Sequence, residues 1–162
     1  MKNFIGLLIL AVLFLVPFEV FADEKLPTVQ LRLLASHIAN KIVTEAVTNC
    51  ATRGYLVSAA VVDRNGNLAA FLRNPLSGPH TITVSQRKAY SSATLRSATS
   101  QMGARSDLSF APGILLIVGG VPISFSGIFY GGVAVSGAKP DLYEECAKAG
   151  LEAVADFMDF VD

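Results

Sequence analysis

His80 stands in a setting that could support ligand chemistry. It follows a Ser-Gly-Pro loop and precedes a predicted helix, so its imidazole could project from a constrained loop at a helix N-terminus. Its polar neighbours along the chain are Thr81, Arg87, Lys88 and Tyr90. A histidine nitrogen can ligate a haem iron, apolar walls can enclose the macrocycle, and cations can pair with the propionates. A structural role, in which Thr81 caps the helix through its hydroxyl, explains the same residues, and both interpretations stay open.

Two residues elsewhere could ligate the same kind of group. His37 lies at the edge of the apolar stripe of the first predicted helix, where it fits a partly exposed helix residue as well as a ligand. Tyr130 lies among strand residues and fits the core or an oligomer interface, although a phenolate can also ligate haem iron. Neither residue is singled out by its own neighbours.

Other chemistries lack the residues they need. The two histidines do not form a metal-binding pair, which argues against a zinc hydrolase. The pairs Gly119-Gly120 and Gly131-Gly132 have neither phosphate-loop spacing nor a lysine alongside. No serine lies in a G-x-S-x-G elbow, so a serine hydrolase is not indicated. With 13 basic and 13 acidic residues, the chain has no basic excess to attract nucleic acid.

The first 22 residues resemble a secretory signal peptide. Lys2 precedes an apolar run over 4–16, and Val20-Phe21-Ala22 offers small residues where a signal peptidase reads. The run is too short to cross a bilayer, and Pro17 ends it early. We therefore predict cleavage after Ala22, a periplasmic or extracellular location, and no stable membrane insertion after cleavage.

Residues 23–162 suit a single domain. Periodicity and turn residues predict these elements: helix 28–53, hairpin strands 56–62 and 68–72, helix 81–95, strands 114–118, 121–125 and 128–135, and helix 140–160. Hairpin connections dominate, which favours an antiparallel sheet with helices layered on it. Cys50 and Cys146 lie on the stripes of the first and last helices, so they form either one disulfide or two buried thiols.

Five sequence blocks stand in order along the predicted domain. They are Ala60-Val61-Val62-Asp63-x-x-Gly66-x-Leu68, His80-Thr81-x-x-x-Ser85-x-x-Lys88-Ala89-Tyr90-Ser91-Ser92-Ala93, Pro112-Gly113-x-x-x-x-x-Gly119-Gly120-Val121-Pro122-Ile123, Gly131-Gly132-Val133-Ala134-Val135-Ser136-Gly137 and Asp141-x-x-x-Glu145-Cys146-Ala147-x-Ala149-Gly150. Together they resemble the GlcG/HbpS family of small haem-binding proteins, also known as haem-degrading domains.

The resemblance implies a profilin-like α+β fold, with a roughly five-stranded antiparallel sheet and flanking N- and C-terminal helices. It also implies homo-oligomers and haem as the cofactor. Carried over to this sequence, it places His80 or Thr81 against the iron, with His80 the first choice of metal ligand. Residues available to the rest of the haem are Arg87, Lys88, Tyr90 and Arg105, and His37 is a further candidate.

The function expected from these observations is that of an exported haem-binding protein, active in haem storage, transport or sensing. Two alternatives remain at this point. One is an enzyme that degrades haem, and the other is a binding module for a corrinoid or a small organic acid.

Overall fold

The computed structural model of the protein describes residues 27–159. The predicted signal peptide, residues 1–22, lies outside the described residues. The chain divides into residues 1–31 and residues 32–162, and every described helix and strand belongs to the second unit. None of the described helices is both long enough and apolar enough to cross a membrane.

Four antiparallel strands form one sheet. They are β1 (Ser58–Asp63), β2 (Leu68–Arg73), β3 (Gly120–Phe125) and β4 (Ile128–Ser136), in the spatial order β2-β1-β4-β3. The β1–β2 hairpin turns at 63–67, as its Asp-Arg-Asn-Gly-Asn sequence predicts, because Asp63 accepts hydrogen bonds from the amides of Asn65 and Asn67. β3 is an edge strand, which explains why it tolerates Pro122.

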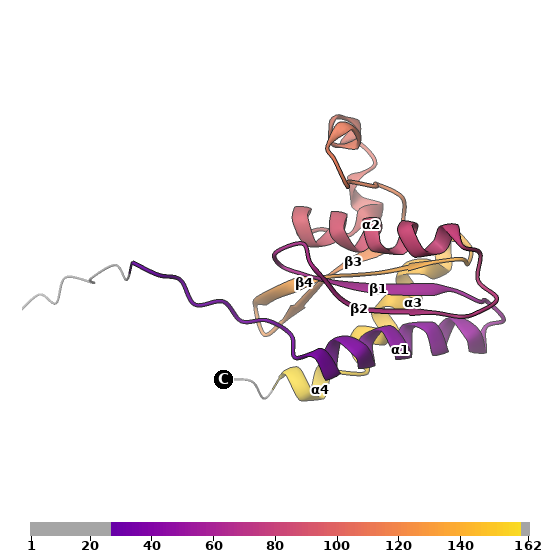
Figure 1. Ribbon diagram of the computed structural model, residues 1–162, viewed down its shortest axis with the longest axis horizontal. Helices are drawn as coiled ribbons and strands as arrows, with labels where there is room; N and C mark the ends of the chain where they lie inside the picture. The colour runs from indigo at the N-terminus through magenta and orange to yellow at the C-terminus, as the bar shows by residue number, and fades with distance from the viewer. Residues whose placement is uncertain (1–26, 160–162) are drawn as a thin grey trace, which may run out of the picture. The chain divides into compact units, whose positions relative to one another are not determined.

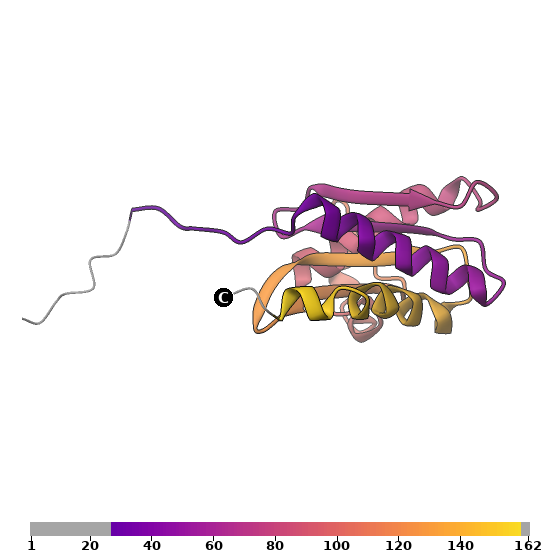
Figure 2. The ribbon, with the colours of Figure 1, turned by 90° about the horizontal axis from the view of Figure 1, so that it is seen from below.

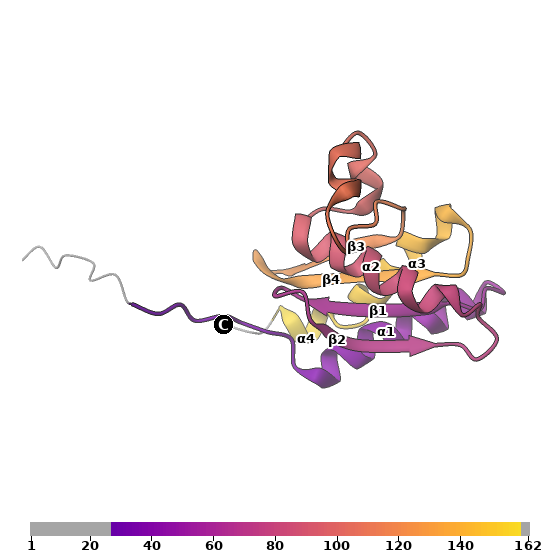
Figure 3. The same cartoon turned by 45° about the horizontal axis from the view of Figure 1, so that its top comes forward.

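Helices cover both faces of the sheet. The helices are α1 (Ser36–Thr52), α2 (His80–Leu95), α3 (Pro140–Glu152) and the short α4 (Ala155–Met158), with 3-10 turns η1 (Thr99–Met102) and η2 (Ser106–Phe110). α2 lies on one face, whereas α1 and α3 lie side by side on the other (Figures 1 and 2). The connection from α2 to β3, which carries η1 and η2, stands out on the α2 side (Figure 3).

Strand alternation divides the core into two clusters. Val61 and Val133 face α1 and α3 in the larger cluster, together with the apolar stripes of those helices. On the other face, Ala60 and Ala134 pack against alanines of α2. A Cβ atom added to Gly132 would lie 2.5 Å from the carbonyl oxygen of Ala89. The α2 face is therefore built from small residues that let the helix lie directly on the sheet.

The α+β class and the antiparallel sheet are confirmed, but the expected fifth strand is wrong. The apolar run over 114–118 pairs with no strand among the described residues. Instead, α2 side chains bond its backbone: Arg87 Nη2 donates to Ile114 O (2.9 Å), Lys88 Nζ donates to Val118 O (2.9 Å), and Ser91 Oγ accepts from the Leu115 amide (2.7 Å). These side chains satisfy polar groups that a neighbouring strand would otherwise meet.

Two helix boundaries also differ from those predicted. α1 begins at Ser36 rather than near residue 28, and Leu33, with 52% of its surface exposed, lies outside it. The C-terminal helix ends at Glu152 because a tight turn follows, in which the Val154 amide bonds to Leu151 O at 3.1 Å. That turn buries Val154 completely before α4 begins.

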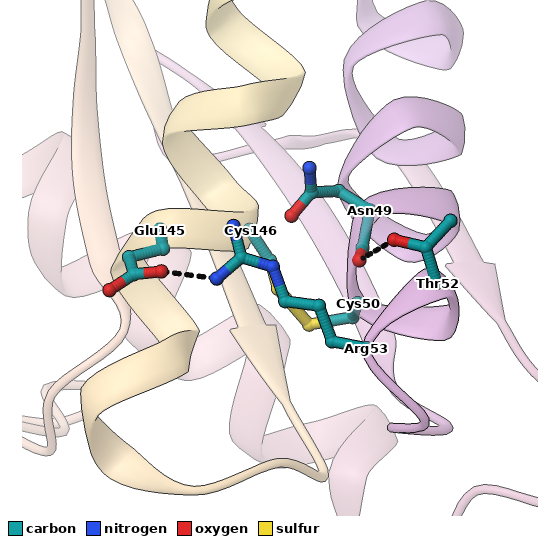
Figure 4. A network of polar contacts seen from close by, with 6 residues as sticks. All are labelled: Asn49, Cys50, Thr52, Arg53, Glu145 and Cys146. Atoms are coloured by element: carbon teal, nitrogen blue, oxygen red, sulfur yellow. Dashed lines mark hydrogen bonds and ion pairs between the residues drawn. A yellow bond between two sulfur atoms is a disulfide. The ribbon is translucent and has the colours of Figure 1, made fainter.

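A disulfide joins α1 to α3. Cys50 and Cys146 are bonded, with 5.6 Å between their Cα atoms, and both are fully buried. Figure 4 shows the ion pair of Arg53 with Glu145 beside them. The end of the first helix thus meets the start of the last, and the bonded alternative for the two cysteines is confirmed.

Candidate functional site

An apolar groove opens between the start of α1 and the C-terminal turn. We call it the α1–α4 groove; its volume is about 530 Å³, and it is lined by Arg32, Leu33, Leu34, Ala35, His37, Ile38, Tyr130, Phe157 and Met158. These residues come from three distant parts of the chain. The volume lies in the range of small-molecule and cofactor sites, which are mostly apolar with a few polar groups.

Three residues of the α1–α4 groove have side chains that can ligate a haem iron. His37 is exposed in the first turn of α1, Tyr130 is buried in β4, and Met158 is buried in α4. Imidazole, phenolate and thioether are all known axial groups of haem. Within residues 27–159, no group of three or more His, Cys, Asp or Glu side chains is placed to hold a bare metal ion. The groove thus combines apolar walls with side chains whose chemistry allows ligation of a haem iron.

A second concavity lies on the opposite face of the sheet. We call it the α2 hollow; its volume is about 430 Å³, and it is lined by Val62, Gly66, Leu68, Gln86, Arg87, Tyr90, Pro112 and Gly113. Its polar side chains come from α2, and its remaining walls come from the β1–β2 hairpin and from the connection that follows η2. Two of the predicted site residues, Arg87 and Tyr90, therefore share this hollow.

His80 and Thr81 lie in neither concavity. His80 is the exposed first residue of α2. Thr81 is fully buried; its hydroxyl donates to Gly78 O (2.6 Å) and contacts the hydroxyls of Ser58 (2.7 Å) and Ser77 (2.9 Å). Thr81 does not cap α2, because the helix already begins at His80. Their haem contacts stay predictions, and the geometry favours a structural role for Thr81.

Lys88 points into the core. It is fully buried, and its Nζ bonds to Val118 O and lies 3.8 Å from the centre of the Tyr143 ring. Burial lowers the pKa of Lys88 to about 7, and the charge of Glu144 partly opposes this shift. Arg105, the other cation considered for the propionates, is exposed and paired with Asp107 at 3.0 Å.

The structure thus separates residues that the sequence had grouped. His37 belongs to α1 and His80 to α2, and these two helices lie on opposite faces of the sheet (Figure 1). Sequence reasoning missed Arg32, Phe157 and Met158 as neighbours of His37. The only available signal was the apolar residues near the C-terminus, which a continuous helix explained equally well.

Comparisons with known proteins bear on this arrangement. Residues 34–152 match the family described as "Haem degrading protein HbpS-like". A double mutant of HbpS from Streptomyces reticuli is 33% identical, with a TM-score of 0.76 over 82% of this chain and 94% of that one. No curated protein matches the chain.

Two more distant structures share the fold. Klebsiella pneumoniae protein ORFY is 20% identical, with a TM-score of 0.75 over 84% of this chain and 97% of that one. PduOC, solved as a complex with haem, is 20% identical, with a TM-score of 0.68 over 75% of this chain and 95% of that one.

Proposed function

The chain belongs to the family of HbpS-like haem-degrading proteins, and from this membership we propose that it binds haem in the α1–α4 groove. The observation that carries the proposal is an exposed imidazole, that of His37, in the wall of an otherwise largely apolar groove of about 530 Å³. A PduOC complex with haem on the same fold supports the choice of ligand.

The lining residues have complementary roles in this proposal. His37 ligates the iron from the first turn of α1, where its side chain is exposed and needs no rearrangement of the core. The leucines before α1 and Phe157 of α4 exclude water from the macrocycle. Arg32 also lines the groove and is a cation that can pair with a propionate. Bound haem would supply iron that can take up oxygen or an electron.

We further propose that the protein is exported, with cleavage after Ala22, and acts outside the cytoplasm in haem storage, transport or sensing. The signal-like segment over 1–22 supports export, and the disulfide between Cys50 and Cys146 suits an oxidising compartment. Assembly into homo-oligomers belongs to the same proposal.

A titration of the purified protein with haemin, followed by absorbance, tests the site. We expect saturable binding with a Soret band, and about tenfold or more weaker binding in His37→Ala, because loss of a ligand or its support typically has at least this effect. His80→Ala is the comparison variant, since it removes the exposed histidine of α2 that the sequence predicts as the alternative ligand. If His37 holds the iron, His80→Ala should bind haemin like wild type. Loss of binding in His80→Ala alone would move the site to α2, and non-saturating spectra in all three proteins would reject haem as the ligand.

Haem degradation is the second candidate, favoured by the description of the family itself. It needs oxygen as the oxidant and an electron donor. Ascorbate added to the haem-loaded protein in air should then bleach the Soret band and release iron to a ferrous chelator. A Soret band that persists, with no iron released, would leave binding as the function.

A further inference from the structure

The α2 hollow contains three polar side chains from neighbouring turns of one helix. Gln86, Arg87 and Tyr90 line it, and the haem proposal uses none of them. Within residues 27–159, the Tyr90 hydroxyl and the Gln86 side-chain amide make no hydrogen bond. They are therefore polar groups at a concave surface that a ligand could satisfy.

The Tyr90 ring is held in place by close backbone approach. A Cβ atom added to Gly66 would lie 2.9 Å from a ring carbon, and one added to Gly113 would lie 3.1 Å from another. Both glycines also have positive φ, +89° and +83°, which favours glycine at these positions. The hairpin turn and the connection after η2 thus fix the ring between them, so the phenol position is set before any ligand arrives.

Arg87 is fixed in a similar way but keeps most of its donors. One guanidinium nitrogen bonds to Ile114 O at 2.9 Å, and arginine has five N–H groups in total. No acidic residue lines the α2 hollow. The carboxylate of the adjacent Asp63 accepts bonds from the amides of its own turn at 2.8 and 2.9 Å. Among the residues that line the hollow, Arg87 is therefore the charged one.

The other walls are apolar. Val62, Leu68 and Pro112 line the hollow beside the ring of Tyr90. An anchored guanidinium that faces no carboxylate, next to an apolar wall, is complementary to an anion that carries an apolar body. We propose that the α2 hollow is a second binding site, for a small monocarboxylate whose carboxylate pairs with Arg87 and whose apolar part packs on Val62, Leu68 and the Tyr90 ring.

This site is separate from the proposed haem site. α2 covers one face of the sheet, while α1 and α4 lie on the other, and the two concavities share no lining residue (Figure 1). The inference therefore does not rest on haem binding, and either proposal can fail without the other.

The test is a titration of the ¹⁵N-labelled protein with benzoate as the probe, followed by NMR. We expect saturable shifts of the Gly66 and Gly113 amide signals, which belong to the walls of the hollow. Benzamide, the neutral isostere, should bind about tenfold more weakly, because it cannot form the charged pair with Arg87. Equal binding of benzoate and benzamide would overturn the assignment of a carboxylate.

Two variants test the location of the site, and one of them keeps the bond from Arg87 to Ile114 intact. Arg87→Gln should weaken benzoate binding about tenfold and remove its advantage over benzamide. Leu68→Glu places a carboxylate on a half-exposed edge-strand position and should exclude benzoate without touching the bond from Arg87 to Ile114. The matched control is Arg105→Gln, an exposed arginine outside the hollow, which should bind like wild type.

A competition with haemin separates the two sites. If they are distinct, saturating haemin leaves the benzoate titration unchanged, and His37→Ala does not alter it. Displacement of benzoate by haemin would show that the α2 hollow takes the haem itself, and the absence of saturable shifts in wild type would reject the second site.

Discussion

Lysine side chains are rarely fully buried unless they are paired. Lys88 is fully buried, and among residues 27–159 the contacts of its Nζ are with a carbonyl oxygen and an aromatic ring. A protonated amine has three donors, and these two acceptors leave one of them unmet. A neutral amine is less costly to bury than a charged one. The environment of Lys88 therefore disfavours its charged form, in agreement with a pKa lowered to about 7 by burial.

This lowered pKa predicts how stability depends on pH. The pKa of Lys88 is about 7 in the folded protein, against 10.5 for an ordinary lysine such as that of the unfolded chain. Between these values the unfolded chain binds more protons, so the free energy of unfolding should rise with pH from 7 to 10. Chemical denaturation at a series of pH values measures this slope, whose upper limit for one group is about 1.4 kcal/mol per pH unit.

Two variants assign the slope to this residue. Lys88→Met should flatten it, because the apolar replacement has no proton to lose. Lys139→Met changes an exposed lysine at the start of α3 and should leave the slope as in wild type. An unchanged slope in Lys88→Met would show that the amine is not the group responsible.

Helix geometry explains why two neighbouring residues of the predicted site point to different places in the structure. Arg87 and Lys88 are consecutive, and the sequence treats them as one pair of cations. Successive residues of an α-helix point about 100° apart, so Arg87 reaches the α2 hollow while Lys88 enters the core. Their spacing from His80 was visible in the sequence, but the rotation of α2 relative to the sheet was not.

At the scale of elements, α2 depends on close contact with the sheet. A Cβ atom at Gly132 would meet Ala89 O at 2.5 Å and the Ala93 amide nitrogen at 2.7 Å, and backbone atoms cannot move aside cheaply. Gly132→Ala should therefore destabilise the fold by about 1–3 kcal/mol, as overpacking typically does. Urea unfolding measures the loss.

Gly103→Ala is the control for this substitution. Gly103 has an ordinary helical φ of −57° and nothing within 4 Å of a built Cβ. Gly103→Ala should lower the free energy of unfolding much less than Gly132→Ala does. Equal losses in the two variants would argue against the close helix–sheet contact.

At this scale, an element encoded by local sequence could be predicted, whereas one decided by tertiary contacts could not. The hairpin of β1 and β2 was predictable because its turn residues and alternation are contained in about fifteen consecutive residues. The run over 114–118 has the same apolar, branched composition as a strand. What decides its structure is the set of side chains that α2 presents to it, and that set depends on packing between segments far apart in sequence.

At the scale of the whole molecule, the α1–α4 groove joins residues 32–38 to residues 130 and 157–158. No short motif encodes such a site, because it exists only after β4 and the C-terminal turn have docked beside α1. The family resemblance predicted haem from motifs elsewhere in the chain. The groove itself became visible only in three dimensions.

The disulfide stabilises the whole molecule because it restricts the conformations of the unfolded chain. Cys50 and Cys146 are 96 positions apart, and a loop of this length gives about 4 kcal/mol or more on the chain-entropy estimate. Replacing both cysteines with alanine should lower the free energy of unfolding by about that amount. Arg53→Gln is the control: it removes only the exposed ion pair with Glu145, a type of contact worth about 1 kcal/mol or less.

The same bond makes residues 50–146 a closed covalent ring that contains all four strands and α2. The connection after η1 lies within this ring and carries Phe110, which is 89% exposed. A single cut by chymotrypsin after Phe110 would therefore open the ring without releasing a fragment. The nicked protein would run as one band in a non-reducing denaturing gel and as two bands once a thiol reductant is added.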